Sequence, residues 1–106
     1  MATINIRVVV FQEGDAWVAQ ALEYDIGAQA TDLQALERRF AMTLRAELEE
    51  SLKRGRTPFG GIDPAPEYFH KMWDGDSPTP KFKASGSMTP RSGNAPPVGY
   101  EMLLAA

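Results

Sequence analysis

The first thirty residues alternate between apolar and polar positions, which is the pattern of β-strands. Residues 4–11 are rich in β-branched side chains, and the run becomes apolar on both faces at its end, as expected of a strand that is covered on both sides. Gly14 marks a turn before a second strand at about 16–24, and a third short strand is expected at 26–30. The short connections favour an antiparallel meander.

A spacing of three and four residues between apolar positions follows and predicts one long amphipathic helix. Thr31 is the expected N-cap, Gln34 would complete a capping box, and Gly55 is a natural C-terminal cap. The apolar stripe consists of Leu33, Leu36, Phe40, Leu44, Leu48 and Leu52. Oppositely charged pairs at four-residue spacing are Arg45–Glu49, Glu49–Lys53 and Glu50–Arg54. The stripe is expected to pack on the sheet.

The composition changes near Gly55. Residues 1–54 contain no Pro and two Gly, whereas 55–106 contain all eight Pro and the other seven Gly. We therefore expect a β-β-β-α core over 1–55 and a Pro/Gly-rich, irregular C-terminal arm over 56–106, with a short helix near 66–73 and a last strand near 98–104. The predicted fold class is α+β, a small antiparallel sheet with one long helix packed on it.

Composition and charge exclude several functional classes. The chain has 106 residues, and its 11 basic and 14 acidic side chains give a net charge of −3, which makes free nucleic acid or an acidic membrane an unlikely partner. The absence of Cys excludes disulfides, thiolate catalysis and cysteine-ligated metals. No apolar run approaches the ~18 residues of a membrane span, and the N-terminus lacks the pattern of a signal peptide. A cytoplasmic protein is expected.

Few residues are candidates for catalysis or metal binding. His70 is the single imidazole, and Asp74 and Asp76 follow it closely, so these three side chains define one alternative, a metal- or ligand-binding protein. Glu23 and Asp25 form a carboxylate pair of the kind that can divide acid and base roles, although solvation of a strand end is the simpler interpretation. We expect no enzyme activity, no metal site and no cofactor.

The long helix also carries a basic patch. Arg38, Arg39 and Arg45 lie on it, interrupted by Glu37 and Glu47. Such a mixture is usually a solvated face, so weak nucleic-acid binding through these arginines remains only an alternative.

Aromatic side chains exceed what a meander and one helix can cover on one side. They are Trp17, Tyr24, Phe59, Tyr68, Phe69 and Trp73. Two interpretations remain open: some of them form an interface, or the C-terminal segment folds back and buries them within the subunit. If an interface forms, the expected partner-binding residues are Tyr68, Phe69 and Trp73 of the arm and Arg38 and Arg45 of the long helix.

Residues 8–48 resemble the HicB-like antitoxin domain family. The resemblance is carried by the strand 8–11, the turn Glu13-Gly14, the aromatic-x-Ala strand Trp17-Val18-Ala19, the short strand 26–29, the small residue in Ala30-Thr31 before the helix, and Ala35-Leu36 early in the helix. It implies a β-β-β-α-β fold like a trimmed ribonuclease-H-type domain without its active site. Family members commonly oligomerise and bind a small ribonuclease toxin.

The resemblance and the residue chemistry agree on a non-catalytic function. The first strand has no central Asp to bind a catalytic metal, as a nuclease of this type would need. The resemblance also implies that many family members add a DNA-binding segment that allows autorepression. No recognisable DNA-binding module follows Gly55 in this sequence, which argues against autorepression here. The expected function is therefore that of a protein-binding module, a homodimer or higher oligomer, with a small toxin-like protein as partner.

Overall fold

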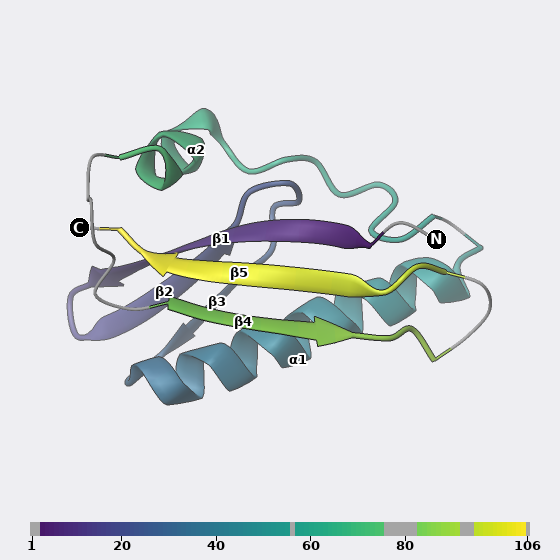
Figure 1. Cartoon of the computed structure of the whole chain (residues 1–106), viewed down its shortest axis with the longest axis horizontal. Coiled ribbons are helices and arrows are strands. Elements are labelled where there is room, and N and C mark those ends of the chain that lie inside the picture. The colour runs from purple at the N-terminus through teal and green to yellow at the C-terminus, as the bar shows by residue number, and fades with distance from the viewer. Residues whose placement is uncertain (1–2, 56, 76–82, 92–94, 106) are drawn as a thin grey trace.

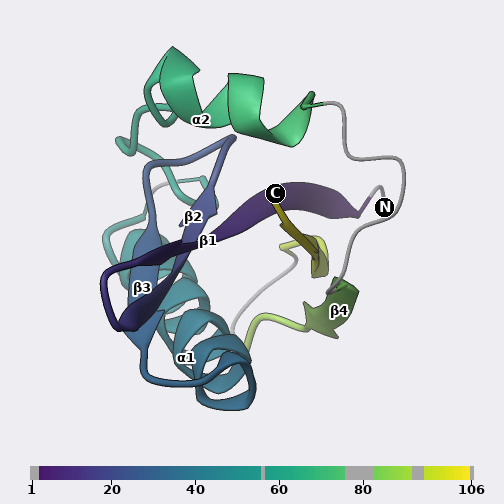
Figure 2. The same ribbon diagram turned by 90° about the vertical axis from the view of Figure 1, so that its left-hand side faces the viewer.

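The computed structural model describes residues 3–55, 57–75, 83–91 and 95–105, which form an α+β fold with a five-stranded mixed sheet and two helices. Helix α1 (Leu33–Lys53) covers one face of the sheet, and the short helix α2 (Glu67–Trp73) lies over the other face (Figures 1 and 2). The sheet order is β3-β2-β1-β5-β4. The strands are β1 (Ile4–Glu13), β2 (Ala16–Ala21), β3 (Gly27–Ala30), β4 (Lys83–Met88) and β5 (Val98–Leu104).

Strands form at the three positions predicted near the N-terminus, and β1 is the central one. It pairs antiparallel with β2, which in turn pairs antiparallel with β3. Alternate β1 residues such as Val8 and Val10 are fully buried in the core beneath α1. Val9 points to the opposite face and is equally buried, which confirms that this part of β1 is covered on both sides.

The prediction of an antiparallel sheet is wrong at its centre, where β1 and β5 are parallel from Ile4↔Val98 to Val10↔Leu104. The reason is the connection between these strands, because α1, α2 and β4 all lie between them and return the chain in its original direction. The last strand itself was predicted correctly, at 98–104. Strands from both sides of Gly55 therefore build one sheet (Figure 1).

The prediction of irregular structure beyond α2 is also wrong in part, because residues 83–88 form strand β4 along β5. Its side chains alternate, with Ala84, Gly86 and Met88 on the side of α1 and polar residues on the other side. The ring of Tyr100 lies over Gly86 and meets Phe40 of α1 edge-on, with ring centres 5.6 Å apart. The parts of the predicted irregular stretch at 76–82 and 92–94 lie outside the described residues.

Helix α1 forms over the predicted residues, but its N-terminal cap differs from the prediction, and the predicted ion pair between Glu49 and Lys53, both of which the structure describes, does not form. Its N-cap is Asp32 rather than Thr31, because the Asp32 carboxylate accepts a hydrogen bond of 2.7 Å from the Ala35 N–H and Asp32 has extended backbone angles. The predicted stripe is confirmed, since Leu36, Phe40, Leu44 and Leu48 are buried and the two end leucines pack partly against the core. Two predicted ion pairs form, Arg45–Glu49 at 3.8 Å and Glu50–Arg54 at 3.0 Å.

Neither of the helices in the described ranges is long and apolar enough to cross a membrane. The short helix was predicted at the correct place, and α2 begins at Glu67, directly after Pro66.

Candidate functional site

The loop between the helices is fixed to the core by one buried hydroxyl. The Ser51 side chain donates to the Leu48 carbonyl at 2.8 Å and accepts from the Phe59 N–H at 2.9 Å. Phe59 has a positive φ of 59°, which is rare for a residue other than glycine, and its ring is 1% exposed against Tyr24. Serine at this position of the helix therefore fixes the loop that leads to α2.

Replacing Ser51 by alanine should lower the free energy of unfolding by about 1–2 kcal/mol, because the buried Phe59 N–H would lose its acceptor. Urea denaturation measures this effect. Ser51→Thr, which keeps the hydroxyl, should recover part of the loss. Glu47→Ala on the exposed side of α1 is the control and should change stability by less than about 0.5 kcal/mol. If Ser51→Ala lowers the free energy of unfolding no more than the Glu47→Ala control does, this hydrogen bond does not hold the loop.

The same loop pairs with the segment that follows β2. The Asp25 N–H donates to the Asp63 carbonyl at 2.7 Å, and the Ala65 N–H donates to the Leu22 carbonyl at 3.0 Å. These main-chain bonds continue the β2 side of the sheet into the loop. They place α2 directly over the face of β1 that α1 leaves uncovered (Figure 2).

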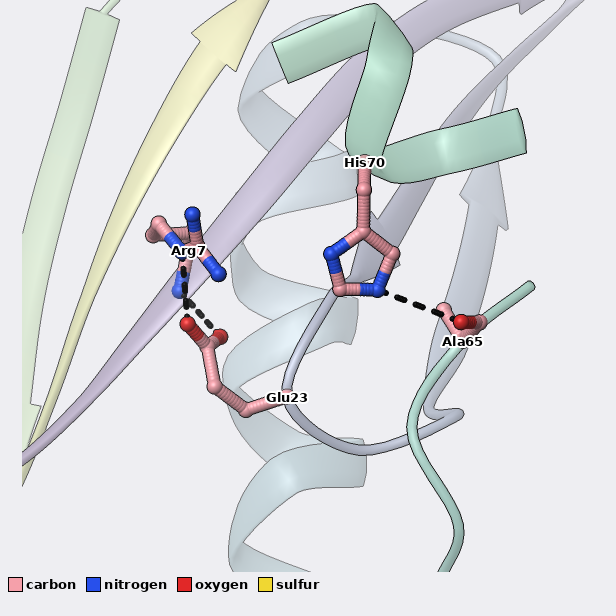
Figure 3. Close-up of polar contacts among 4 residues, drawn as sticks. All are labelled: Arg7, Glu23, Ala65 and His70. Carbon is pink, nitrogen blue, oxygen red and sulfur yellow. Dashed lines mark hydrogen bonds and ion pairs between the residues drawn. The ribbon is translucent and has the colours of Figure 1, made fainter. Parts of the chain in front are cut away.

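The carboxylate pair predicted at the end of the second strand has structural contacts. Glu23 accepts from the Arg7 main-chain N–H at 2.8 Å and from Arg7 Nε at 2.6 Å (Figure 3). Strand β2 ends at Ala21, and beyond this point the Glu23 carboxylate, in place of a main-chain carbonyl, accepts the hydrogen bond from the β1 main chain. Asp25 accepts from Gln20 Nε2 at 2.9 Å. The two carboxylates hold different partners, so the geometry does not pair them as acid and base.

His70 lies on the inner side of α2 and is half-buried. Its Nε2 is 3.2 Å from the Ala65 carbonyl oxygen (Figure 3), so this hydrogen bond requires the proton on Nε2. Asp74 is exposed at the end of α2, where its main-chain N–H donates to the His70 carbonyl. Asp76 lies outside the described residues. Within the described ranges, no cluster of three or more metal-ligating side chains occurs.

Helix α2 is attached to the sheet by aromatic contacts and leaves much of its apolar surface open. Phe69 stacks on Phe11 of β1 with ring centres 5.9 Å apart, and Tyr68 meets Phe69 edge-on at 5.3 Å. None of the α2 side chains is fully buried, and Tyr68 is 67% exposed. We call Tyr68, Phe69, Met72 and Trp73 the α2 surface.

The aromatic residues therefore fall into two groups, and only one of them is packed within the subunit. Trp17, Tyr24 and Phe59 pack against or within the core of the subunit. The aromatic residues of α2 remain partly open to solvent. The sequence contained the signal for this division, because the open group shares one short helix whereas the packed group is spread over strands and loops.

The arginines of α1 lie on the other side of the sheet from the α2 surface. Arg45 is fixed at the end of β4, where its Nη1 donates to the Thr89 carbonyl at 3.3 Å. Arg38 and Arg39 are exposed and border an open groove between α1 and β3, with a volume of about 610 Å³. We call it the arginine groove; its lining is Ala28, Gln29, Ala35, Arg38, Arg39, Met42 and Thr43. The predicted partner-binding residues thus fall into separate groups.

Tyr100 is the one described side chain whose acidity is clearly changed. Burial, and to a smaller extent the Glu37 carboxylate, raise the pKa of Tyr100 above its ordinary value. The hydroxyl thus stays protonated, which suits its place between β4 and α1.

Comparison of the chain with protein-family models, with curated proteins and with solved structures gave no match.

Proposed function

We propose that this chain is a non-catalytic protein-binding module of the HicB-antitoxin type, which forms oligomers and binds a small toxin-like protein. The observation that carries the proposal is the α2 surface. This seven-residue helix has three aromatic side chains and one methionine, and none of its residues is buried. Aromatic side chains that are held in place but left open are typical of the centre of a protein interface.

The order of the elements supports the family assignment within this proposal. Three antiparallel-paired strands, a long helix and a later strand beside the first correspond to the β-β-β-α-β arrangement that the resemblance implies. Here β5 takes the place of the last strand of that arrangement, and β4 is an addition at the edge of the sheet.

The contacts of the polar candidates support a non-catalytic role. Glu23 is engaged by Arg7 and Asp25 by Gln20, while His70 contacts a main-chain carbonyl. Each of these groups already stabilises the loop or the strand end that positions α2. A catalytic acid or base would instead be expected to face a cleft, within hydrogen-bond reach of a bound substrate.

Co-purification from cells tests the proposal directly. A tagged chain at native expression level should retain a small basic protein in near-equal amount, since the chain itself carries a charge of −3. The double variant Tyr68→Ser/Trp73→Ser should lose this partner, because removing an aromatic residue at an interface centre costs about 2 kcal/mol or more. Glu47→Ser is the control, since Glu47 is exposed on the other side of the sheet and lies outside the arginine groove.

The oligomeric state is read in the same preparations by analytical ultracentrifugation. Self-association at micromolar concentration is the expected result. A monomeric chain that retains no partner would contradict the proposal, and so would a partner retained equally by the Tyr68→Ser/Trp73→Ser variant and by the wild type.

A further inference from the structure

The arginine groove is lined by two basic side chains, although the chain as a whole has a net charge of −3. Arg38 and Arg39 have no ion-pair partner among the described residues, whereas Arg7, Arg45 and Arg54 each have one. No acidic side chain is among the described residues that line the groove. Two free guanidinium groups on an acidic protein form a local site for carboxylates, which arginine binds with two parallel hydrogen bonds.

The wall opposite the arginines is a free strand edge. Among the strands that the structure describes, β3 pairs with β2 on one side only and is the outermost strand of the sheet (Figure 2). The Ile26 carbonyl accepts from the Ala21 N–H at 2.9 Å and therefore faces β2. Because main-chain groups alternate along a strand, Gly27 and Gln29 direct their N–H and C=O groups away from the sheet.

This edge is short, with four residues, but it carries no side chain of the kind that usually prevents strand addition. Exposed edges are generally protected by lysine, by proline or by a bulge, and the sequence of β3 is Gly-Ala-Gln-Ala. The outer strand β4, in contrast, carries Lys83. The main chain of β3 is therefore open to a further strand that would lie directly beside the arginines.

We propose that the arginine groove binds an extended acidic peptide segment, which adds to β3 as a further strand and pairs its carboxylates with Arg38 and Arg39. Side chains of an added strand alternate between the two faces, so every second residue would face α1. Acidic residues at those positions would reach the guanidinium groups of Arg38 and Arg39. This site lies on the opposite side of the sheet from the α2 surface and does not depend on it.

Fluorescence anisotropy with a defined peptide tests the site. The probe is a short labelled peptide in which glutamate and valine alternate, so that one face of the added strand is acidic. The wild-type chain should bind it at low salt and more weakly as salt rises. Two control peptides, one with lysine in place of glutamate and one with proline in place of the central valine, should not bind, since they remove the charge and the strand N–H respectively.

Variants separate the two parts of the site. Arg38→Gln/Arg39→Gln should weaken binding by at least about tenfold, and Arg54→Gln, an exposed arginine at the other end of α1, should leave it unchanged. Gln29→Pro should weaken binding because it removes an outward N–H, whereas Gln29→Ala should not. If Gln29→Pro fails to fold, the amide signals of Gly27 and Gln29 in a nuclear magnetic resonance titration give the same information, and they should shift on binding.

Four results would overturn this proposal. The first is that the wild type does not bind the glutamate–valine peptide at low salt, and the second is that Arg54→Gln weakens peptide binding as much as Arg38→Gln/Arg39→Gln does. The third is that a single-stranded oligonucleotide binds more tightly than the peptide and that Arg38→Gln/Arg39→Gln abolishes this binding. The fourth is that the wild type forms a dimer that dissociates in Arg38→Gln/Arg39→Gln. The last two would assign the groove to nucleic acid or to a second copy of the chain. Tyr68→Ser/Trp73→Ser should still bind the peptide, so failure of the α2 surface and failure of this site are distinguishable.

Discussion

Replacing Phe59 by alanine should lower the free energy of unfolding by about 3–5 kcal/mol, the range for removing a fully buried phenylalanine. The ring is 1% exposed, lies 4.7 Å from the ring of Tyr24, and belongs to the core although it comes from a loop. Its loss would leave a cavity under the segment that positions α2. Urea denaturation gives the free energy, and hydrogen exchange at the Ala65 amide should become faster as the loop loosens.

A second substitution at the same position separates the ring from the backbone. Glycine usually costs about 0.5–1 kcal/mol relative to alanine in regular structure. Phe59 has a φ of 59°, where a residue with a Cβ is strained by roughly 1–2 kcal/mol. Phe59→Gly should therefore be at least as stable as Phe59→Ala. If Phe59→Gly is clearly less stable than Phe59→Ala, residue 59 does not have a positive φ. If both variants lower the free energy of unfolding by less than about 1 kcal/mol, the Phe59 ring is not buried in the core.

The elements with strong local patterns could be predicted from the sequence. The stripe from Leu36 to Leu48 has a regular helical spacing, and the β-branched residues of β1 alternate, so periodicity alone locates both. The bounds of α2 and β5 were also correct, because Pro66 marks the start of the helix and an apolar run marks the strand. At the start of α1 two neighbouring residues, Thr31 and Asp32, could both cap, and only the backbone geometry decides between them.

Strand β4 was missed because its stability comes from its neighbours. Its sequence, Lys-Ala-Ser-Gly-Ser-Met, has no β-branched or aromatic residue and so has low intrinsic strand propensity. The alternation of small or apolar residues with polar ones was a usable signal. The parallel pairing of β1 with β5 could not be read from local sequence at all, because it depends on the path of the chain through more than eighty intervening residues.

The helices that carry the candidate residues could be predicted, but the arrangement of these residues in space could not. Spacing on one short helix places Tyr68, Phe69 and Trp73 together, and the structure agrees. Nothing local to the sequence indicates that α1 and α2 lie on opposite faces of the sheet, so Arg38 was grouped with a surface that it does not share. The arginine groove also needs β3 as its second wall, and that contact exists only in the folded sheet.

Replacing Gly86 by alanine should lower the free energy of unfolding by about 2–3 kcal/mol, the upper part of the range for overpacking. A Cβ at this position would lie 2.5 Å from the Tyr100 hydroxyl oxygen and 2.6 Å from the ring carbon that bears it. The ring cannot move away easily, because it packs edge-on against Phe40 and is shielded from solvent enough to raise its pKa. The clash must therefore displace β4.

Two controls assign that cost to the ring. Gly99→Ala in the neighbouring strand should change stability by less than about 1 kcal/mol, because its Cβ would meet other atoms only at 3.7 Å. In a Tyr100→Ala background, Gly86→Ala should become stabilising by about 0.5–1 kcal/mol, since the ring is gone and alanine suits a strand better than glycine. Urea denaturation of the four proteins of this cycle measures the coupling. An equal cost of Gly86→Ala in both backgrounds would show that the aromatic ring is not what requires glycine in β4.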